Sequence, residues 1–119
     1  MSRNTWKGIG GADSCFNLKG GGFVNLDLYK RACEHPGVKH FLIPGEGTFH
    51  QYHGGVTTGG VDKTVREALM NEMKSQYMAI RNKPYSPPST DPVYIGKIPQ
   101  EAMVFVEASA KKKLETMKH

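Results

Sequence analysis

The sequence has little of what membrane, exported and redox proteins need. No run of large apolar residues exceeds four, as in Met103-Val104-Phe105-Val106, and a bilayer crossing takes roughly 20. The first seven residues lack the apolar core of a signal peptide, so we expect a cytoplasmic protein without a membrane partner. Cys15 and Cys33 form neither a CxxC pair nor a zinc-ribbon spacing, which favours reduced thiols.

Several catalytic and nucleotide-binding motifs are also missing. Gly54 and Gly59 have the glycine spacing of a phosphate-binding loop, but Gly60-Val61 stands where that loop needs Lys-Ser/Thr. The glycines at 20–22 lack the GxGxxG spacing of a dinucleotide site. Ser14 has no GxSxG context. These patterns indicate no nucleotide loop and no serine nucleophile.

The composition is that of a small globular domain. The chain has 119 residues, of which 38% are hydrophobic and 23% are charged, values typical of a protein with one core. The formal charge of +5 is spread along the chain, and only Lys111-Lys112-Lys113 forms a run. That run lies near the C-terminal end of a predicted helix, where positive charge complements the helix dipole. We therefore expect no nucleic-acid partner.

Periodicity and chain breakers predict an α+β fold, with a small mixed sheet of three to four strands covered by about three helices. Strands are expected at 14–19, 38–43, 48–52 and 93–95. Helices are expected at 26–34, at 62–81 and from Pro99 towards the C-terminus. Residues 1–19 are expected to be an irregular arm with its short strand, and residues 20–119 to form a single α+β domain.

The second and third helices have predicted buried faces. In the second helix these are Val65, Ala68, Leu69, Met73, Tyr77 and Ile80, which recur at three- and four-residue spacing. In the third they are Met103, Val106, Ala110 and Leu114. Four prolines within residues 82–92 predict an extended connector between the second helix and the last strand.

The densest cluster of reactive side chains lies in the run Gly45-Glu-Gly-Thr-Phe-His-Gln-Tyr-His-Gly-Gly55. Glu46, His50 and His53 offer the donor set of a zinc or manganese site. On a strand, His50 and His53 point to opposite faces, so such a site needs a turn or bulge between them. The commoner role of such histidines is structural, with the ring bonded to a backbone carbonyl. For His40, beside three apolar residues, the structural role is expected.

The same run is also a candidate ligand-binding face for a small polar molecule. Its candidate residues are Glu46, Thr48, His50, Gln51, Tyr52 and His53. No catalytic residue and no cofactor follows from the pattern beyond the candidate divalent metal.

Three stretches resemble a module found in larger bacterial proteins that are described as glycosyltransferase-like. They are Gly20-Gly-Gly-Phe-Val-Asn-Leu-Asp-Leu-Tyr29, the run from Gly45 to Gly55, and Tyr77 to Pro88 followed by Pro92 to Gly96. The resemblance covers roughly residues 20–110. It implies a piece of a sugar-transferring enzyme, in which residues 20–25 shape the acceptor side and His50 or His53 helps to hold a metal–diphosphate.

The sequence departs from that family pattern in one important respect. A complete transferase of this type needs a nucleotide-binding half and an Asp-x-Asp metal motif, whereas every aspartate here is isolated. We therefore expect a binding module that is not catalytic alone and that binds a small polar ligand or a protein partner, with a homo-oligomer as one form. The alternative is a small metal-dependent enzyme that uses Glu46, His50 and His53.

Overall fold

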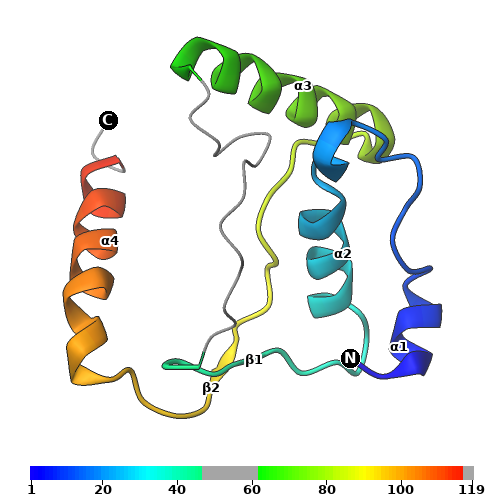
Figure 1. The fold of residues 1–119 in the computed structure, drawn as a ribbon. Helices are drawn as coiled ribbons and strands as arrows, with labels where there is room; N and C mark the ends of the chain where they lie inside the picture. Colours follow the sequence, from blue (N-terminus) through cyan, green and yellow to red (C-terminus); the bar gives the residue numbers. More distant parts are fainter. Residues whose placement is uncertain (47–61, 117–119) are drawn as a thin grey trace. The chain divides into compact units, whose positions relative to one another are not determined.

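The structure is a computed structural model that describes residues 1–46 and 62–116. These residues contain four α-helices, two short 3₁₀-helices and one pair of strands (Figure 1). The chain divides into two compact units. Of the described residues, unit 1 holds 1–39 and 62–91, and unit 2 holds 40–46 and 92–116. No helix in these ranges is both long enough and apolar enough to span a bilayer.

The described residues of unit 1 form helices joined by turns and irregular segments, with no strand. Its elements are α1 (Arg3–Gly8), the 3₁₀-helix η1 (Lys19–Gly21), α2 (Val24–Cys33) and α3 (Lys63–Arg81). Helix α1 lies where the sequence predicted an irregular arm, because the Ser2 hydroxyl caps it by accepting from the Thr5 amide. The strand predicted at 14–19 is wrong: turns and η1 occupy these residues, and the glycines of η1 adopt positive φ.

Helix α3 confirms the most regular pattern in the sequence. The Asp62 carboxylate caps its start by accepting from the Thr64 amide at 2.8 Å. The helix ends at Asn82, which adopts the left-handed conformation (φ 55°) that closes many helices. Helix α2 begins two residues before its predicted start, with Phe23 rather than Asn25 at the cap position.

An aromatic cluster forms the core of unit 1. Phe16, Phe23, Met73 and Tyr77 are buried, and Tyr77 is only 1% exposed. The Tyr77 ring meets Tyr85 edge-on at 5.4 Å between ring centroids, a favoured geometry for aromatic pairs. This cluster joins the segment before α2 to the second half of α3 and to the connector.

The predicted buried face of α3 is therefore correct only over the helix's second half. Met73 and Tyr77 are buried, while Leu69 and Ile80 are half-buried. Val65 and Ala68 are exposed. The periodicity gives the direction of the apolar stripe, but only the second half of α3 lies over the aromatic cluster.

Unit 2 holds the only strands among the described residues. Strand β1 (Phe41–Leu42) pairs in parallel with β2 (Val93–Tyr94), with Phe41 opposite Val93 and Leu42 opposite Tyr94. The prediction of a three- to four-stranded mixed sheet is wrong for the described residues. Residues with a high strand propensity form a strand only where a neighbouring segment pairs with them. The predicted strand at 48–52 lies outside the described residues.

A tight turn ends β1. Gly45 has φ 90°, and a Cβ on it would lie 2.5 Å from the Lys97 carbonyl oxygen and 2.9 Å from Cδ of Pro99. The chain therefore needs glycine at 45 for both its backbone angle and its close approach to residues 97–99.

After this contact come η2 (Gln100–Ala102) and α4 (Met103–Thr116). The predicted buried face of α4 is wrong for Val106, Ala110 and Leu114, which are exposed, while Met103 is half-buried.

Candidate functional site

The structure leaves most of the predicted site outside its described residues. Thr48, His50, Gln51, Tyr52 and His53 all lie there. Glu46 is described, and it is exposed at the end of the turn that follows β1. Its amide donates to the Ile43 carbonyl at 3.2 Å. Among the described residues, no group of three His, Cys, Asp or Glu side chains is placed to hold a metal.

The strand pair of unit 2 is the first candidate surface. Its apolar side chains are well exposed: Phe41, Leu42, Ile43, Val93, Tyr94 and Ile95. The exposed fraction is 48% for both Phe41 and Val93, and 66% for Tyr94. Because neighbouring residues on a strand point to opposite faces, both faces of the pair are apolar.

This exposure is unusual for parallel strands. Parallel sheets occur almost only where layers cover both faces, and their strands are correspondingly apolar throughout. A sheet of two strands is also marginal in water, and independent stability takes three or more strands or a covering helix. The pair β1–β2 thus has the composition of an inner part of a sheet, but the described residues of unit 2 add no further strand beside it.

Helix α4 adds further exposed apolar surface to unit 2. Val104 is 62% exposed, Phe105 is 73% exposed, and Leu114 is also exposed. Exposed apolar residues that occur singly are normal in proteins, whereas a contiguous group marks an interaction site. On the strand pair, exposed Phe41 lies beside exposed Val93 and exposed Leu42 beside exposed Tyr94, so each face holds an adjacent apolar pair.

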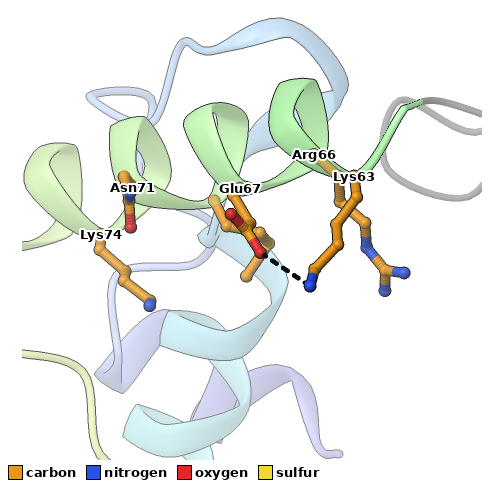
Figure 2. Close-up of a pocket in the computed structure, with 6 residues that line it drawn as sticks. Lys63, Arg66, Glu67, Asn71 and Lys74 are labelled. Carbon is orange, nitrogen blue, oxygen red and sulfur yellow. Dashed lines mark ion pairs between the residues drawn. The ribbon is translucent and has the colours of Figure 1, made fainter.

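The second candidate is a charged face on the first half of α3, drawn in Figure 2. Lys63, Arg66, Glu67, Asn71 and Lys74 line a hollow of about 480 Å³ together with Met70. The Lys63 ammonium and the Glu67 carboxylate point towards each other at 3.9 Å (Figure 2). Both side chains are well exposed, and such pairs contribute little. All the lining residues come from one helix, so this face is an open side of α3 and not an enclosed site.

The third candidate is an apolar hollow of about 680 Å³ beside the aromatic core of unit 1. It is lined by Phe23, Lys74, Ser75, Met78, Ala79, Pro84 and Tyr85. Phe23 and Tyr85 meet nearly edge-on at 5.5 Å between centroids. Lys74 carries the only formal charge in this lining.

An ion-pair network lies beside the same core. Asp27 is 1% exposed and accepts from Arg31 Nε at 2.8 Å and from Arg81 Nε at 2.7 Å. Arg81 also binds Asp13 at 2.8 Å and lies over the Phe16 ring. Burial alone raises the pKa of Asp27, but the hydrogen bonds from Arg81 and Arg31 outweigh it and hold that pKa below its usual value.

The network is structural. Arg31 also donates to the carbonyls of Ile9 and Gly11, so one guanidinium joins α2 to the segment after α1. Each charge in the network is matched within it, which leaves no free acid, base or nucleophile for a reaction. The sequence reasoning missed this cluster, and the signal available was the i, i+4 spacing of Asp27 and Arg31.

A second group of polar contacts, the Lys30–Glu34–Ser89 tether, holds the proline-rich connector to α2. The Lys30 ammonium binds Glu34 at 2.8 Å, the Pro87 carbonyl at 3.0 Å and the Ser86 hydroxyl at 3.3 Å. Glu34 in turn accepts from the amide and hydroxyl of Ser89. The hydrogen bonds from Lys30 and from the Ser89 amide lower the pKa of Glu34 to about 2.

Comparisons with known proteins returned no relative. No family model matches the chain, and neither a curated protein nor a solved structure matches it. The geometry of the described residues is therefore the basis of the functional argument.

Proposed function

We propose that this chain is a protein-binding module that is not catalytic alone, and that the strand pair of unit 2 is its binding surface. The observation that carries the proposal is the exposure of apolar side chains on both faces of a parallel pair. Parallel strands of this composition are covered in folded proteins. A partner that supplies further strands or a covering layer would remove this surface from water.

The energetics favour such a partner. Fully burying a side chain such as valine, leucine or phenylalanine is worth roughly 1.5–3 kcal/mol each. Phe41, Val93 and Ile95 are about half exposed, so each still has much of that free energy to gain. Backbone hydrogen bonds along a strand edge would add affinity, as in other cases where a partner extends a sheet.

The resemblance to a module of larger bacterial proteins supports the same proposal, since such a module works beside other parts. Small-ligand binding by residues 46–53 is compatible with it and stays a separate proposal. The metal-dependent enzyme has no structural observation in its favour among the described residues.

Hydrogen exchange on dilute, monomeric protein tests the proposal. The Val93 and Ile95 amides donate to the carbonyls of His40 and Leu42, so we expect them to exchange slowly. The Phe41 and Tyr94 amides face away from the ladder and should exchange much faster. Equal protection of all four amides in the monomer would mean that the chain covers its own strand pair, and the proposal would fail.

A pair of matched variants tests the apolar surface itself. Val93 in unit 2 is 48% exposed and Val65 in unit 1 is 49% exposed, so the same change at both removes equally exposed apolar side chains, one from a strand and one from a helix. We expect Val93→Thr to lower the fluorescence of a bound hydrophobic dye such as ANS severalfold more than Val65→Thr does. An equal effect of the two changes would contradict the assignment of the surface to unit 2.

A further inference from the structure

The two outer edges of the strand pair differ in what they offer a partner. The ladder uses the carbonyls of His40 and Leu42 and the amides of Val93 and Ile95. Backbone groups alternate in direction along a strand. The amides and carbonyls of Phe41 and Tyr94 therefore point outwards, on the β1 edge and the β2 edge respectively.

The β2 edge is poorly suited to a further strand. The outward positions on either side of Tyr94 are Pro92, which has no N–H, and Gly96, whose φ of 100° lies outside the strand region. Proline at such a position is a common device that blocks strand addition. Tyr94 alone remains as a donor on this edge.

The β1 edge has no such block. Lys39, Phe41 and Ile43 occupy its outward positions, and each has an N–H. Within the described residues, the Ile43 carbonyl already accepts from the Glu46 amide. The amide and carbonyl of Phe41 point away from the ladder, because Val93, which lies opposite Phe41, donates to the His40 carbonyl. The apolar run from Phe41 to Ile43 is also typical of a strand with neighbours on both sides.

We propose that a second copy of this chain occupies the β1 edge, with the two β1 strands antiparallel about a two-fold axis at Phe41. The proposal deepens the protein-binding function above and rests on it. It joins two strand pairs into one sheet in the order β2-β1-β1-β2. That sheet passes the minimum size for independent stability, which the two-stranded pair does not reach.

The β1 edge is complementary to itself in this arrangement. Phe41 faces Phe41 of the second copy as a hydrogen-bonded pair, and Lys39 faces Ile43 on either side. About four backbone hydrogen bonds follow from that register: two at the Phe41 pair, and one from each Ile43 amide to the Lys39 carbonyl of the other copy, because the Ile43 carbonyl is already engaged by Glu46. A two-fold axis makes the contact closed, so association stops at the dimer.

Backbone geometry selects the antiparallel direction. In a parallel ladder, a residue that faces the partner strand lies opposite one that faces away, as Val93 lies opposite Phe41 here. Two copies that present the same edge therefore cannot set residue 41 against residue 41 in a parallel pairing. The antiparallel pairing also separates the two copies of Lys39 by about 14 Å, from four residues at roughly 3.4 Å each. That distance exceeds the screening length in physiological salt, which is about 8 Å.

Sedimentation velocity on the full chain across a concentration series tests the edge. Phe41→Pro removes the outward N–H of β1, and Tyr94→Pro removes the outward N–H of β2; neither removes a donor from the ladder. We expect the wild type and Tyr94→Pro to dimerise, and Phe41→Pro to weaken the dimer at least tenfold. Phe41→Ala, which keeps the N–H, should weaken it less than Phe41→Pro. Far-UV circular dichroism of the helices controls for folding.

Disulfide cross-linking tests the register, in a background in which the exposed Cys15 is replaced by serine. In the proposed dimer the Cα atoms of residue 41 lie about 5.5 Å apart, within the range of a disulfide. We expect Phe41→Cys to form covalent dimers on mild oxidation, and Lys39→Cys to form few. Equal cross-linking at both positions would show that no antiparallel register centred on Phe41 holds the two copies, and it would overturn the proposal.

The results of these experiments distinguish a failure of the dimer proposal from a failure of the proposed protein-binding function. If the wild type stays monomeric at high concentration and its Phe41 amide remains unprotected, a second copy does not occupy the β1 edge. The partner is then a different protein. A Phe41 amide protected in the dilute monomer overturns both. Equal weakening of the dimer by Phe41→Pro and Tyr94→Pro rejects the β1 edge.

Discussion

The Asp27 carboxylate and the Arg81 guanidinium form a two-point contact, with Nε to Oδ1 at 2.7 Å and Nη2 to Oδ2 at 2.8 Å. Asp27 lies in the first turn of α2, and Arg81 is the last residue of α3. Two parallel hydrogen bonds of this kind fix the orientation of both side chains. The contact therefore sets how the two longest elements of unit 1 meet.

We expect Asp27→Ala to lower the free energy of unfolding by about 3–5 kcal/mol, because it leaves two guanidinium groups without their buried partner. Urea unfolding followed by circular dichroism measures the change. Asp91→Ala, at an exposed aspartate, is the control and should change the free energy by less than about 0.5 kcal/mol. A small loss for Asp27→Ala would show that the network does not stabilise unit 1.

Acid should destabilise unit 1 through Glu34 and Asp27. Both carboxyls have a lower pKa in the folded chain than their ordinary values, 4.5 for Glu34 and 3.8 for Asp27. The unfolded chain then binds more protons as the pH falls, so stability is fully present above about pH 4.5 and declines below it. For Glu34 the decline continues towards its folded pKa of about 2.

Glu34→Gln separates the two contributions. This variant should show a shallower loss of stability between pH 4.5 and pH 3 than the wild type, because residue 34 no longer titrates. Glu72→Gln, at an exposed position of α3, should keep the wild-type slope. Urea midpoints measured across this pH range provide the comparison, and identical slopes for all three proteins would be inconsistent with the Lys30–Glu34–Ser89 tether.

The turn after β1 predicts a contrast between two glycines. Gly45 and Gly37 both have positive φ, but only at Gly45 would a Cβ meet the chain, 2.5 Å from the Lys97 oxygen. Gly37→Ala should cost about 1 kcal/mol for its backbone angle alone. Gly45→Ala should also displace residues 97–99 and speed hydrogen exchange at Val93 and Ile95. Unchanged exchange at these amides would show that the turn does not support the strand pair.

The histidine-rich run gives a further prediction. We expect the double variant His50→Ala/His53→Ala to keep the wild-type thermal midpoint, since these residues are proposed as ligand-binding and not as core groups. A large drop would identify them as structural histidines. Added zinc tests the metal alternative, because a ligand held at 100 times its Kd stabilises the folded chain by about 2.7 kcal/mol. A zinc-dependent rise in the wild type that the double variant lacks would establish that alternative.

The helices show how much of the secondary structure the local sequence predicts. Asp62 as a cap and the apolar stripe through Met73 and Tyr77 predicted α3 correctly, because capping and periodicity act within one helix. Helix α1 was missed because its six residues carry no apolar stripe, and its Ser2 cap is a short-range signal that is easily overlooked. The apolar stripe of α4 was real, yet nothing in the described residues covers it.

The sequence alone determined helices α2, α3 and α4, the connector and the apolar character of the run Phe41-Leu42-Ile43, because each depends on neighbouring residues. Only the tertiary structure decided which of these segments meet. It placed Asp27 against Arg81, 54 positions away, and among the described residues it limited the sheet to one parallel pair. Ion pairs and ladder hydrogen bonds between distant residues depend on how the backbone closes, and local patterns do not encode that closure.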